Sequence, residues 1–258
     1  MSPNFSRRRI LAGLISGAGA VMLAGCDRMT QSAGMGALLR NTEKLTMNSQ
    51  RLLLGNQSLA REYSVADISP VFRANGTQAP DSDEYRDLLE HSFADWRLQV
   101  DGLVQQPLSL SLADLKRMPS RTQITRHDCV EGWSAIGQWQ GVPLGGILDL
   151  ARLKPGARYV VLHCADELEI TFDGSGRYYE SIDLLDAYHP QTILAYAMNG
   201  EDLPVAHGAP LRLRVERQLG YKQAKYLMRI EVVSTFEKLW GGRGGYWEDR
   251  GYEWYAGI

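Results

Sequence analysis

The chain has 258 residues, of which 44% are hydrophobic, and this is enough for one substantial hydrophobic core. Its 28 basic and 30 acidic side chains nearly balance, so the sequence lacks the basic field on which nonspecific binding of nucleic acid depends. Nucleic acid is therefore not expected as a partner. Three cysteines, Cys26, Cys129 and Cys164, are too few for a disulfide-framed fold, so each needs its own explanation.

Residues 1–26 have the pattern of an export signal. Three consecutive arginines begin at Arg7, and the uncharged stretch from Ala12 to Gly25 is too short to favour a stable membrane span. The arginine pair resembles a twin-arginine signal, the route for proteins that are already folded, which a cofactor loaded in the cytoplasm would require. Leu23-Ala24-Gly25-Cys26 resembles a bacterial lipoprotein box. We expect a lipid anchor at Cys26 on the periplasmic side of the cell membrane, and an ordinary signal that ends in cysteine is the alternative.

Two further regions follow the signal. Residues 27–62 are mostly small or polar and show no long apolar period, which predicts a tether with room for one short helix. Residues 63–258 have no internal repeat and no second boundary, which predicts a single domain.

The elements of this domain are predicted from hydrophobic period and from capping and turn residues. Alternating apolar residues indicate strands, Ser111 and Asp114 have capping-box spacing, and Asn199-Gly200 is a turn pair. In chain order we expect a strand at 96–100, a helix from Ser111 that stops at Pro119, an extended run at 122–126, a helix at 143–153, and strands at 159–164, 192–198, 211–215 and 226–232. Many short strands with few short helices predict an α+β fold around mixed or antiparallel sheet.

Cys129 ends the extended run and is followed by glycine and an aromatic residue rather than by continued apolar packing. A thiolate is a soft ligand suited to a metal, although a single cysteine is more often a small buried hydrophobe. The run from Cys129 to Ser134, followed by Trp139-Gln140-Gly141-Val142-Pro143-Leu144, resembles the central motif of the sulfite-oxidase family of molybdenum enzymes. The resemblance implies a mixed-sheet molybdopterin-binding domain in which Cys129 is the metal ligand and the catalytic residue.

A second block begins at His207. Relatives in this family have a His or Asn five residues before an Arg, and a short segment ending in Lys then completes the pterin site; His207, Arg212 and Gln223-Ala224-Lys225 fit that spacing. The pterin carries a phosphate, which favours a guanidinium, an ammonium and backbone amides at a glycine turn. The alternative is that Arg212 and Arg214 form the solvent face of an amphipathic strand.

A third block, Phe72-Arg73-Ala74-Asn75-Gly76, resembles the run that contacts the cofactor in sulfite oxidases. Phe72 and Asn75 match, whereas the arginine is displaced by one position and the histidine is replaced by glycine. Because this arginine helps to bind the oxyanion in sulfite-oxidising members, its displacement puts sulfite in doubt as the substrate.

Cys164 stands where relatives place a polar residue in contact with the cofactor, so it is expected to touch the pterin. A disulfide between Cys129 and Cys164 is the alternative. A zinc site that adds His127 and His163 is disfavoured, because adjacent residues on a strand point to opposite faces.

The resemblance implies a molybdenum-molybdopterin oxidoreductase that transfers an oxygen atom to or from a small-molecule substrate, either a sulfur oxyanion or a sulfoxide. No CxxCH motif or cysteine cluster is present for a haem or iron–sulfur centre, so the expected electron partner is an external cytochrome or a membrane b-type subunit. The alternative, from a different class, is a cofactor-free lipoprotein that serves as a scaffold or binding module.

Overall fold

The computed structural model describes residues 33–55 and 58–258. Two compact units divide the chain between Arg51 and Leu52. The expected export signal, with its arginines and Cys26, lies outside the described residues, so its assignment stays a prediction. None of the helices described has both the length and the apolar character needed to cross a membrane.

Helix α2 (Ala33–Leu54) occupies the predicted tether and is 22 residues long. The prediction of at most one short helix was therefore wrong in length. Alanine, leucine, methionine, lysine and glutamine have high intrinsic helix propensity, and these residue types make up much of the segment. A search for a sustained apolar period does not detect this helix propensity.

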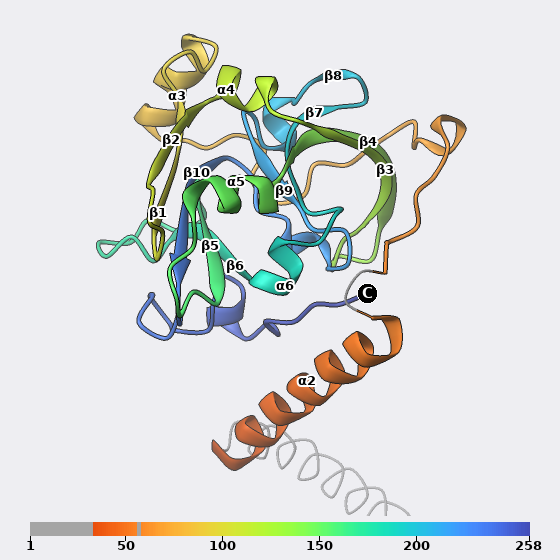
Figure 1. Ribbon diagram of the computed structural model, residues 1–258, viewed down its shortest axis with the longest axis vertical. Helices are drawn as coiled ribbons and strands as arrows, with labels where there is room; N and C mark the ends of the chain where they lie inside the picture. The colour runs from red at the N-terminus through yellow and green to blue at the C-terminus, as the bar shows by residue number, and fades with distance from the viewer. Residues whose placement is uncertain (1–32, 56–57) are drawn as a thin grey trace, which may run out of the picture. The chain divides into compact units, whose positions relative to one another are not determined.

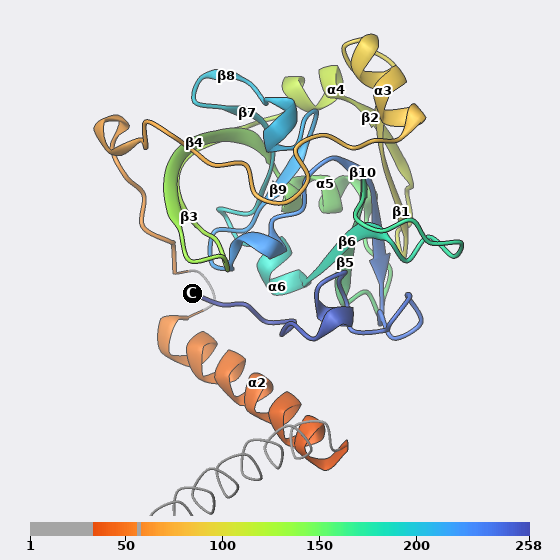
Figure 2. The same cartoon turned by 180° about the vertical axis from the view of Figure 1, so that it is seen from behind.

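The larger unit, Leu52–Ile258, contains two five-stranded sheets (Figures 1 and 2). The first has the order β2 (Leu108–Ser111), β1 (Arg97–Gly102), β10 (Leu227–Val233), β5 (Tyr159–Glu167) and β6 (Arg177–Asp183). The second has the order β3 (Arg121–Asp128), β4 (Ser134–Pro143), β7 (Ile193–Met198) and β8 (Glu201–Asp202), with β9 (Arg212–Arg214) also paired to β7. Strands β1 and β10 are parallel and the other pairs are antiparallel, so the predicted α+β class with mixed sheet is confirmed.

Short helices connect the strands. They are α3 (Asp83–Glu90), α4 (Leu112–Arg117), α5 (Leu144–Ala151) and α6 (Leu184–Ala187), with 3-10 turns η1 (Val65–Asp67), η2 (Val205–His207), η3 (Gly220–Lys222) and η4 (Glu248–Arg250). The predicted capping box at α4 is confirmed, because the Ser111 hydroxyl accepts a hydrogen bond from the Asp114 amide and the Asp114 carboxylate accepts one from the Ser111 amide.

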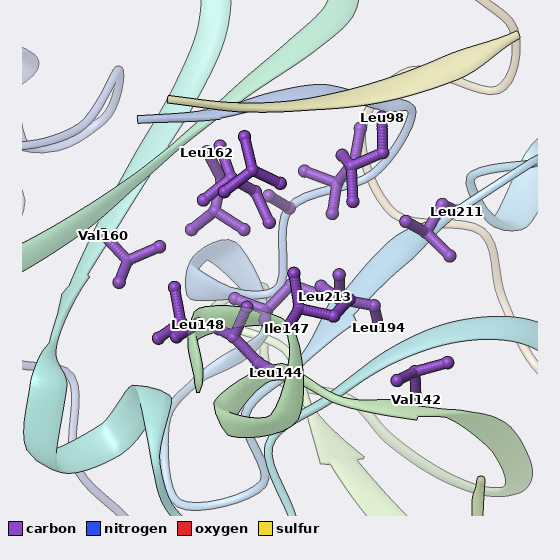
Figure 3. Packing of buried hydrophobic residues seen from close by; sticks show 14 of the residues in the cluster. Leu98, Val142, Leu144, Ile147, Leu148, Val160, Leu162, Leu194, Leu211 and Leu213 are labelled. Carbon is purple, nitrogen blue, oxygen red and sulfur yellow. The ribbon is translucent and has the colours of Figure 1, made fainter. Parts of the chain in front are cut away.

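The main core contains residues of both sheets and of α5. Leu144, Ile147 and Leu148 of α5 are fully buried against apolar side chains that come from β5 in one sheet and from β7 and β9 in the other (Figure 3). Each such side chain contributes roughly 1.5–3 kcal/mol when it is removed from water. This packing joins the two sheets, whose strand ends and loops carry the candidate site.

The Asn199-Gly200 pair forms the tight turn that the sequence predicts. Both residues have positive φ, 53° and 86°, and they connect β7 to β8 in a two-residue hairpin. Asparagine and glycine tolerate this left-handed backbone better than other residues do.

Candidate active site

A cavity of about 180 Å³ lies where six segments of the larger unit meet. Its lining comes from residues 75–77, from the turn at 129–131, from the end of β5 at 166–168, from η3 and the residues after it at 220–225, and from the C-terminal Trp247 and Tyr252 together with Tyr178 of β6. The three sequence blocks therefore converge on one cavity. Of the predicted site residues, its lining includes Asn75, Cys129, Gln223 and Lys225.

Cys129 lies directly after β3, in the tight turn that leads to β4. Its amide donates to the Trp133 carbonyl at 2.9 Å and its own carbonyl accepts from the Gly132 amide at 3.0 Å, so the backbone at the thiol is fixed. Cys129 is 8% exposed, and burial raises the pKa of its thiol. A positively charged centre at the sulfur would favour the thiolate, and a metal ion supplies that charge.

Cys129 and Cys164 are both free thiols, so the alternative of a disulfide between them is wrong. Cys164 lies in β5 within the main core, and its thiol donates to the Leu162 carbonyl at 3.9 Å. Burial raises the pKa of this thiol well above its usual value. Cys164 lies outside the cavity lining, so its contact with the pterin stays a prediction.

Arg212 of β9 is completely buried. Its guanidinium donates to the carbonyl oxygens of His207 at 2.9 Å and Gln223 at 3.3 Å, and its Nε has no hydrogen-bond partner among the described residues. Burial, together with the positive charge of Arg214, lowers the pKa of Arg212 to about 9. This cation thus contacts carbonyl dipoles rather than a carboxylate.

Lys225 lines the cavity, and its ammonium donates to three carbonyl oxygens, those of Asn75 at 2.7 Å, Ala206 at 3.1 Å and Thr77. Burial and the charge of Arg212 lower the pKa of Lys225 to about 7. The pKa of His207 is lowered to about 4, first by burial and then by Arg212 and Lys225, and its Nδ1 has no partner among the described residues. The pKa values of Arg212, Lys225 and His207 are lowered for the same reason, because each group is buried beside another positively charged side chain.

We call Arg212 and Lys225, together with the neutral imidazole of His207 beside them, the cation cluster. Neither Arg212 nor Lys225 forms an ion pair with a carboxylate in the described part of the chain. Buried charge without a partner is costly, and an anion bound at this place would reverse that cost. The cluster therefore fits the phosphate of the expected pterin, which needs donors of this type.

The chain must turn back for Arg212 and Lys225 to approach each other. It does so through η3, because the Leu213 amide donates to the Ala224 carbonyl at 2.8 Å and thereby pairs the two segments. Gly220 allows this path: a Cβ there would lie 2.5 Å from Nε2 of His127. Gly208, with φ of 109°, likewise leaves space for Lys225, whose Cβ would lie 2.8 Å from an added Cβ.

Trp139 of the motif supports the two arginines of β9. Its buried ring lies 4.8 Å from the Arg212 guanidinium and 4.4 Å from that of Arg214, which are cation–π distances. Phe72 packs edge-on against Trp139 at 5.4 Å and against His207 at 5.5 Å. Phe72 thus packs against two residues of the site and lies outside the cavity lining. Ala224 also lies outside the lining and is buried in the core.

The alternative that Arg212 and Arg214 form a solvent face is wrong, because neither is exposed. Arg214 forms an ion pair with Glu216 at 2.6 Å and also donates to Nδ1 of His127 at 3.1 Å. Burial and the two arginines lower the pKa of His127 well below its usual value, so the ring is neutral and accepts this bond. Since Arg214 is already paired, it is not a spare ligand for a phosphate.

Sequence reasoning missed several residues of the cavity. Asp166, Thr77 and Tyr178 line it, as do Trp247 and Tyr252 of the aromatic C-terminal segment. Asp166 had one usable signal, because it follows Cys164 by two residues and so falls on the same side of an extended strand. The C-terminal segment had only its aromatic content, which is also typical of residues that merely cover a core.

A buried charge cluster joins the C-terminal segment to the cavity wall. Lys222 of η3 donates to Glu248 at 2.6 Å and also to Glu180 of β6, and all three side chains are buried. Burial and the nearby Glu248 raise the pKa of Glu180 well above its usual value. These ion pairs hold η3, which lines the cavity, against the C-terminal segment that carries Trp247.

Lys222→Met is therefore expected to destabilise the protein strongly, because it leaves two buried carboxyl groups without their cation. Removal of one partner of a buried ion pair costs about 3–5 kcal/mol. For a unit of this size that corresponds to a fall in melting temperature of at least ~6 °C. Calorimetry of Lys222→Met beside Lys238→Met, whose side chain is exposed, measures the effect; equal melting temperatures for the two variants would contradict it.

Comparison with known proteins places this geometry in context. The family model described as "Oxidoreductase molybdopterin binding domain" matches residues 86–240, which is more than half of the chain. The chain is 36% identical over 252 residues to the "Putative protein-methionine-sulfoxide reductase subunit YedZ1" of Azospira oryzae, and the match covers 98% of this chain and 88% of that protein.

Two further relatives are named protein-methionine-sulfoxide reductase catalytic subunit MsrP. The protein of Ralstonia nicotianae is 35% identical over 54% of this chain and 44% of its own length, and that of Gluconobacter oxydans is 37% identical over 54% and 47%. The chain thus spans less than half the length of these two relatives. Among solved structures, the sulfane dehydrogenase SoxCD from Paracoccus pantotrophus matches with a TM-score of 0.48 and 26% identity, over 55% of this chain and 39% of that one.

Proposed function

Because the chain belongs to the sulfite-oxidase-like family of molybdopterin-dependent oxidoreductases, we propose that it reduces sulfoxides by oxygen-atom transfer at a metal bound to Cys129. As a member of this family it is an oxidoreductase with a molybdenum-pterin cofactor. The reaction consumes two electrons and two protons, breaks the sulfur–oxygen bond, and releases a thioether and water. When bound, the cofactor supplies the two-electron valence change, whereas the protein supplies ligation, orientation and electrostatics.

The proposed roles of the residues follow from their places. The Cys129 thiolate ligates molybdenum, and the cation cluster of His207, Arg212 and Lys225 binds the phosphate of the pterin. Asn75 and Gln223 line the same cavity and hold Lys225 and Arg212 through their carbonyl oxygens. Phe72, Ala224 and Cys164 lie outside the cavity lining, and we propose that they support the pterin-binding wall.

The absence of an arginine from the cavity lining favours a sulfoxide over a sulfur oxyanion. In the described part of the chain the lining contains Lys225 but no guanidinium, and Arg73, the displaced arginine of the third block, is exposed. An oxyanion would need a cation beyond the one used for the phosphate, whereas a sulfoxide is neutral. Val130 and Tyr252, an apolar and an aromatic residue, line the cavity and are 47% and 39% exposed. The names of the relatives point in the same direction.

A substrate screen tests this proposal. Purified, molybdenum-loaded protein is given a reduced dye with methionine sulfoxide or dimethyl sulfoxide, and separately an oxidised dye with sulfite. We expect oxidation of the reduced dye by the sulfoxides and no reaction with sulfite; the opposite pattern would overturn the choice of substrate. Metal analysis separates the enzyme, with about one molybdenum per chain, from a cofactor-free scaffold, which would contain none.

An external protein is the proposed electron donor, either a cytochrome or a membrane b-type subunit, because the given sequence has no CxxCH motif for a covalently attached haem. We further propose the domain organisation of an export signal at 1–26, a tether at 27–62 and a molybdopterin-binding domain at 63–258. The family match at 86–240 lies inside this last range.

The location outside the cytoplasm is tested by two variants. Replacement of Arg7 and Arg8 by Lys should leave unexported protein in the cytoplasm, because the arginine pair is the expected export signal. Cys26→Ala should release soluble protein outside the cytoplasm, because it removes the site of lipidation. Cell fractionation followed by immunoblotting reads out both. Full membrane retention of the Cys26→Ala protein would show that the anchor is a different one.

A further inference from the structure

Two aromatic residues of the C-terminal segment, Trp247 and Tyr252, line the cavity that contains Cys129. Both lie beyond residue 240, where the match to the family model ends. Their rings are stacked with centroids 5.3 Å apart, and Tyr221 of η3, which also lines the cavity, meets Tyr252 edge-on at 5.2 Å. We call Tyr221, Trp247 and Tyr252 the aromatic wall of the cavity.

Other aromatic residues of the same segment have a different place. Tyr246 is 2% exposed and belongs to a core cluster, and the indole N–H of Trp254 donates to the Ser181 hydroxyl at 2.9 Å. These two residues cover the sheet, as aromatic residues at the edge of a core commonly do. Trp247 and Tyr252 border open space instead, so coverage of the core does not account for them.

The aromatic wall is held in place by contacts of the neighbouring residues. Lys222, which follows Tyr221, forms a buried ion pair at 2.6 Å with Glu248, which follows Trp247. The Tyr252 amide donates to the Trp247 carbonyl at 3.0 Å, so the backbone fixes the two rings relative to each other. A ligand that binds to a wall of this kind meets side chains that are already ordered, which favours binding.

The aromatic wall begins next to Cys129. Gly220, the residue before Tyr221, packs against the backbone of Asp128, the residue before Cys129, because a Cβ added to Gly220 would lie 3.3 Å from the Asp128 carbonyl oxygen. Lys225, which is the part of the proposed phosphate site that lines the cavity, donates to carbonyl oxygens on another lining segment. The wall therefore borders the proposed metal position at Cys129.

An aromatic wall suits the alkyl side of a sulfoxide. The sulfur of a sulfoxide and the methyl and methylene groups bound to it carry partial positive charge, whereas the face of an aromatic ring is negative. Sulfur also makes favourable contacts with aromatic rings in its thioether form, which is the product of the reaction. Val130 and Leu168, which line the same cavity, offer apolar surface for the rest of an alkyl chain.

We propose that Trp247 and Tyr252 bind the alkyl groups of the substrate and so determine a specificity for alkyl sulfoxides, of which methionine sulfoxide is an example. With its alkyl groups against the rings, the sulfoxide can direct its oxygen atom towards the metal position at Cys129. The inference rests on the proposed function, sulfoxide reduction at that metal, and adds no step to the reaction.

The first experiment measures steady-state kinetics with a reduced dye and methionine sulfoxide. Trp247→Leu and Tyr252→Leu each remove a ring but keep an apolar side chain. We expect KM to rise at least about threefold in each, with kcat within about twofold of wild type, because the lost contact is made equally before and during the reaction. Tyr252→Phe keeps the ring and should keep the wild-type KM. Phe172→Leu, which removes a fully exposed ring from the loop between β5 and β6, is the matched control and should change neither constant.

A second measurement detects binding without turnover. Oxidised, molybdenum-loaded protein has no electrons for the reaction, so methionine sulfoxide stays intact while saturation-transfer NMR reports which of its protons lie against the protein. We expect the strongest transfer at the S-methyl protons in wild type and its loss in Tyr252→Leu. Tyr252 is 39% exposed, so this variant is expected to fold even if Trp247→Leu does not. Equal transfer to the S-methyl protons in wild type and Tyr252→Leu would overturn the proposal.

The two measurements separate this inference from the proposed function. Transfer to the S-methyl protons that depends on Tyr252, in a protein that reduces no sulfoxide, would support the binding role of the rings and refute sulfoxide reduction. Sulfoxide reduction with the wild-type KM in both Trp247→Leu and Tyr252→Leu would refute the binding role alone. Molybdenum and pterin content is measured in every variant, and its loss from these two would mean that the rings hold the cofactor, which also contradicts the inference.

Discussion

Cys129→Ala is expected to abolish turnover while the protein still binds the pterin. The change removes the proposed metal ligand but only a small side chain from packing, and the turn around it is held by backbone hydrogen bonds to Trp133 and Gly132 that do not involve the thiol. The cation cluster, which is the proposed phosphate site, is unaltered. The measurement is the rate of dye oxidation with a sulfoxide, together with pterin content per chain.

Cys164→Ser is the matched control for this prediction. Cys164 is a buried free thiol like Cys129 but lies in the core behind the cavity. We expect this variant to keep substantial activity, since serine is nearly isosteric with cysteine. Activity of Cys129→Ala close to that of wild type would contradict the assignment of Cys129, and complete loss in Cys164→Ser would place that residue in the catalytic machinery.

Arg212→Ala is expected to lower cofactor content by well over tenfold. If Arg212 pairs with a buried phosphate, its truncation leaves an uncompensated anion, a loss of about 2–5 kcal/mol where about 1.4 kcal/mol is one decade in affinity. Arg214 cannot replace it, because its guanidinium is held by Glu216 and His127. Lys225→Ala should have an effect in the same direction, with the added loss of the bonds that hold residues 75–77.

Two controls accompany the measurement of molybdenum and pterin content. Lys238→Ala removes an exposed positive charge elsewhere and should change nothing. Arg217→Ala should retain more cofactor than Arg212→Ala, because Arg217 forms an ion pair with the carboxylate of Asp186, whereas the Arg212 guanidinium donates to the carbonyl oxygens of His207 and Gln223. Wild-type cofactor content in both Arg212→Ala and Lys225→Ala would show that the cation cluster does not bind the phosphate.

Local sequence signals predicted the elements that depend on local physics. Alternation of Leu98 and Val100 with polar residues found β1, the Ser111–Asp114 box found α4, and Asn199-Gly200 found the hairpin. Strand β4 was missed because glycines interrupt its alternation. Gly141 is required by the close approach of β7, since a Cβ there would lie 2.0 Å from the Leu194 carbonyl oxygen, and this contact is between residues distant in sequence.

The candidate site likewise contains residues that the local sequence predicted and residues that it could not predict. The motifs placed Cys129 and Lys225 at the cavity, whose lining includes both, whereas Arg212 and His207 of the same motif lie outside that lining. The alternation in Arg212-Leu213-Arg214 could not show which face is buried, because all three residues are enclosed by elements distant in sequence. Asp166 and Trp247 reach the cavity only through the arrangement of β5 and the C-terminal segment, which the local pattern does not encode.

The central claim, that the Cys129 sulfur is bound to molybdenum in this cavity, is tested most directly by X-ray absorption at the molybdenum edge, which counts the sulfur atoms bound to the metal. Wild type, Cys129→Ser and Cys164→Ser are loaded and measured in the same way. The predicted result is the loss of about one sulfur ligand in Cys129→Ser, with the wild-type number retained in Cys164→Ser. An unchanged number of sulfur ligands in Cys129→Ser would contradict the claim.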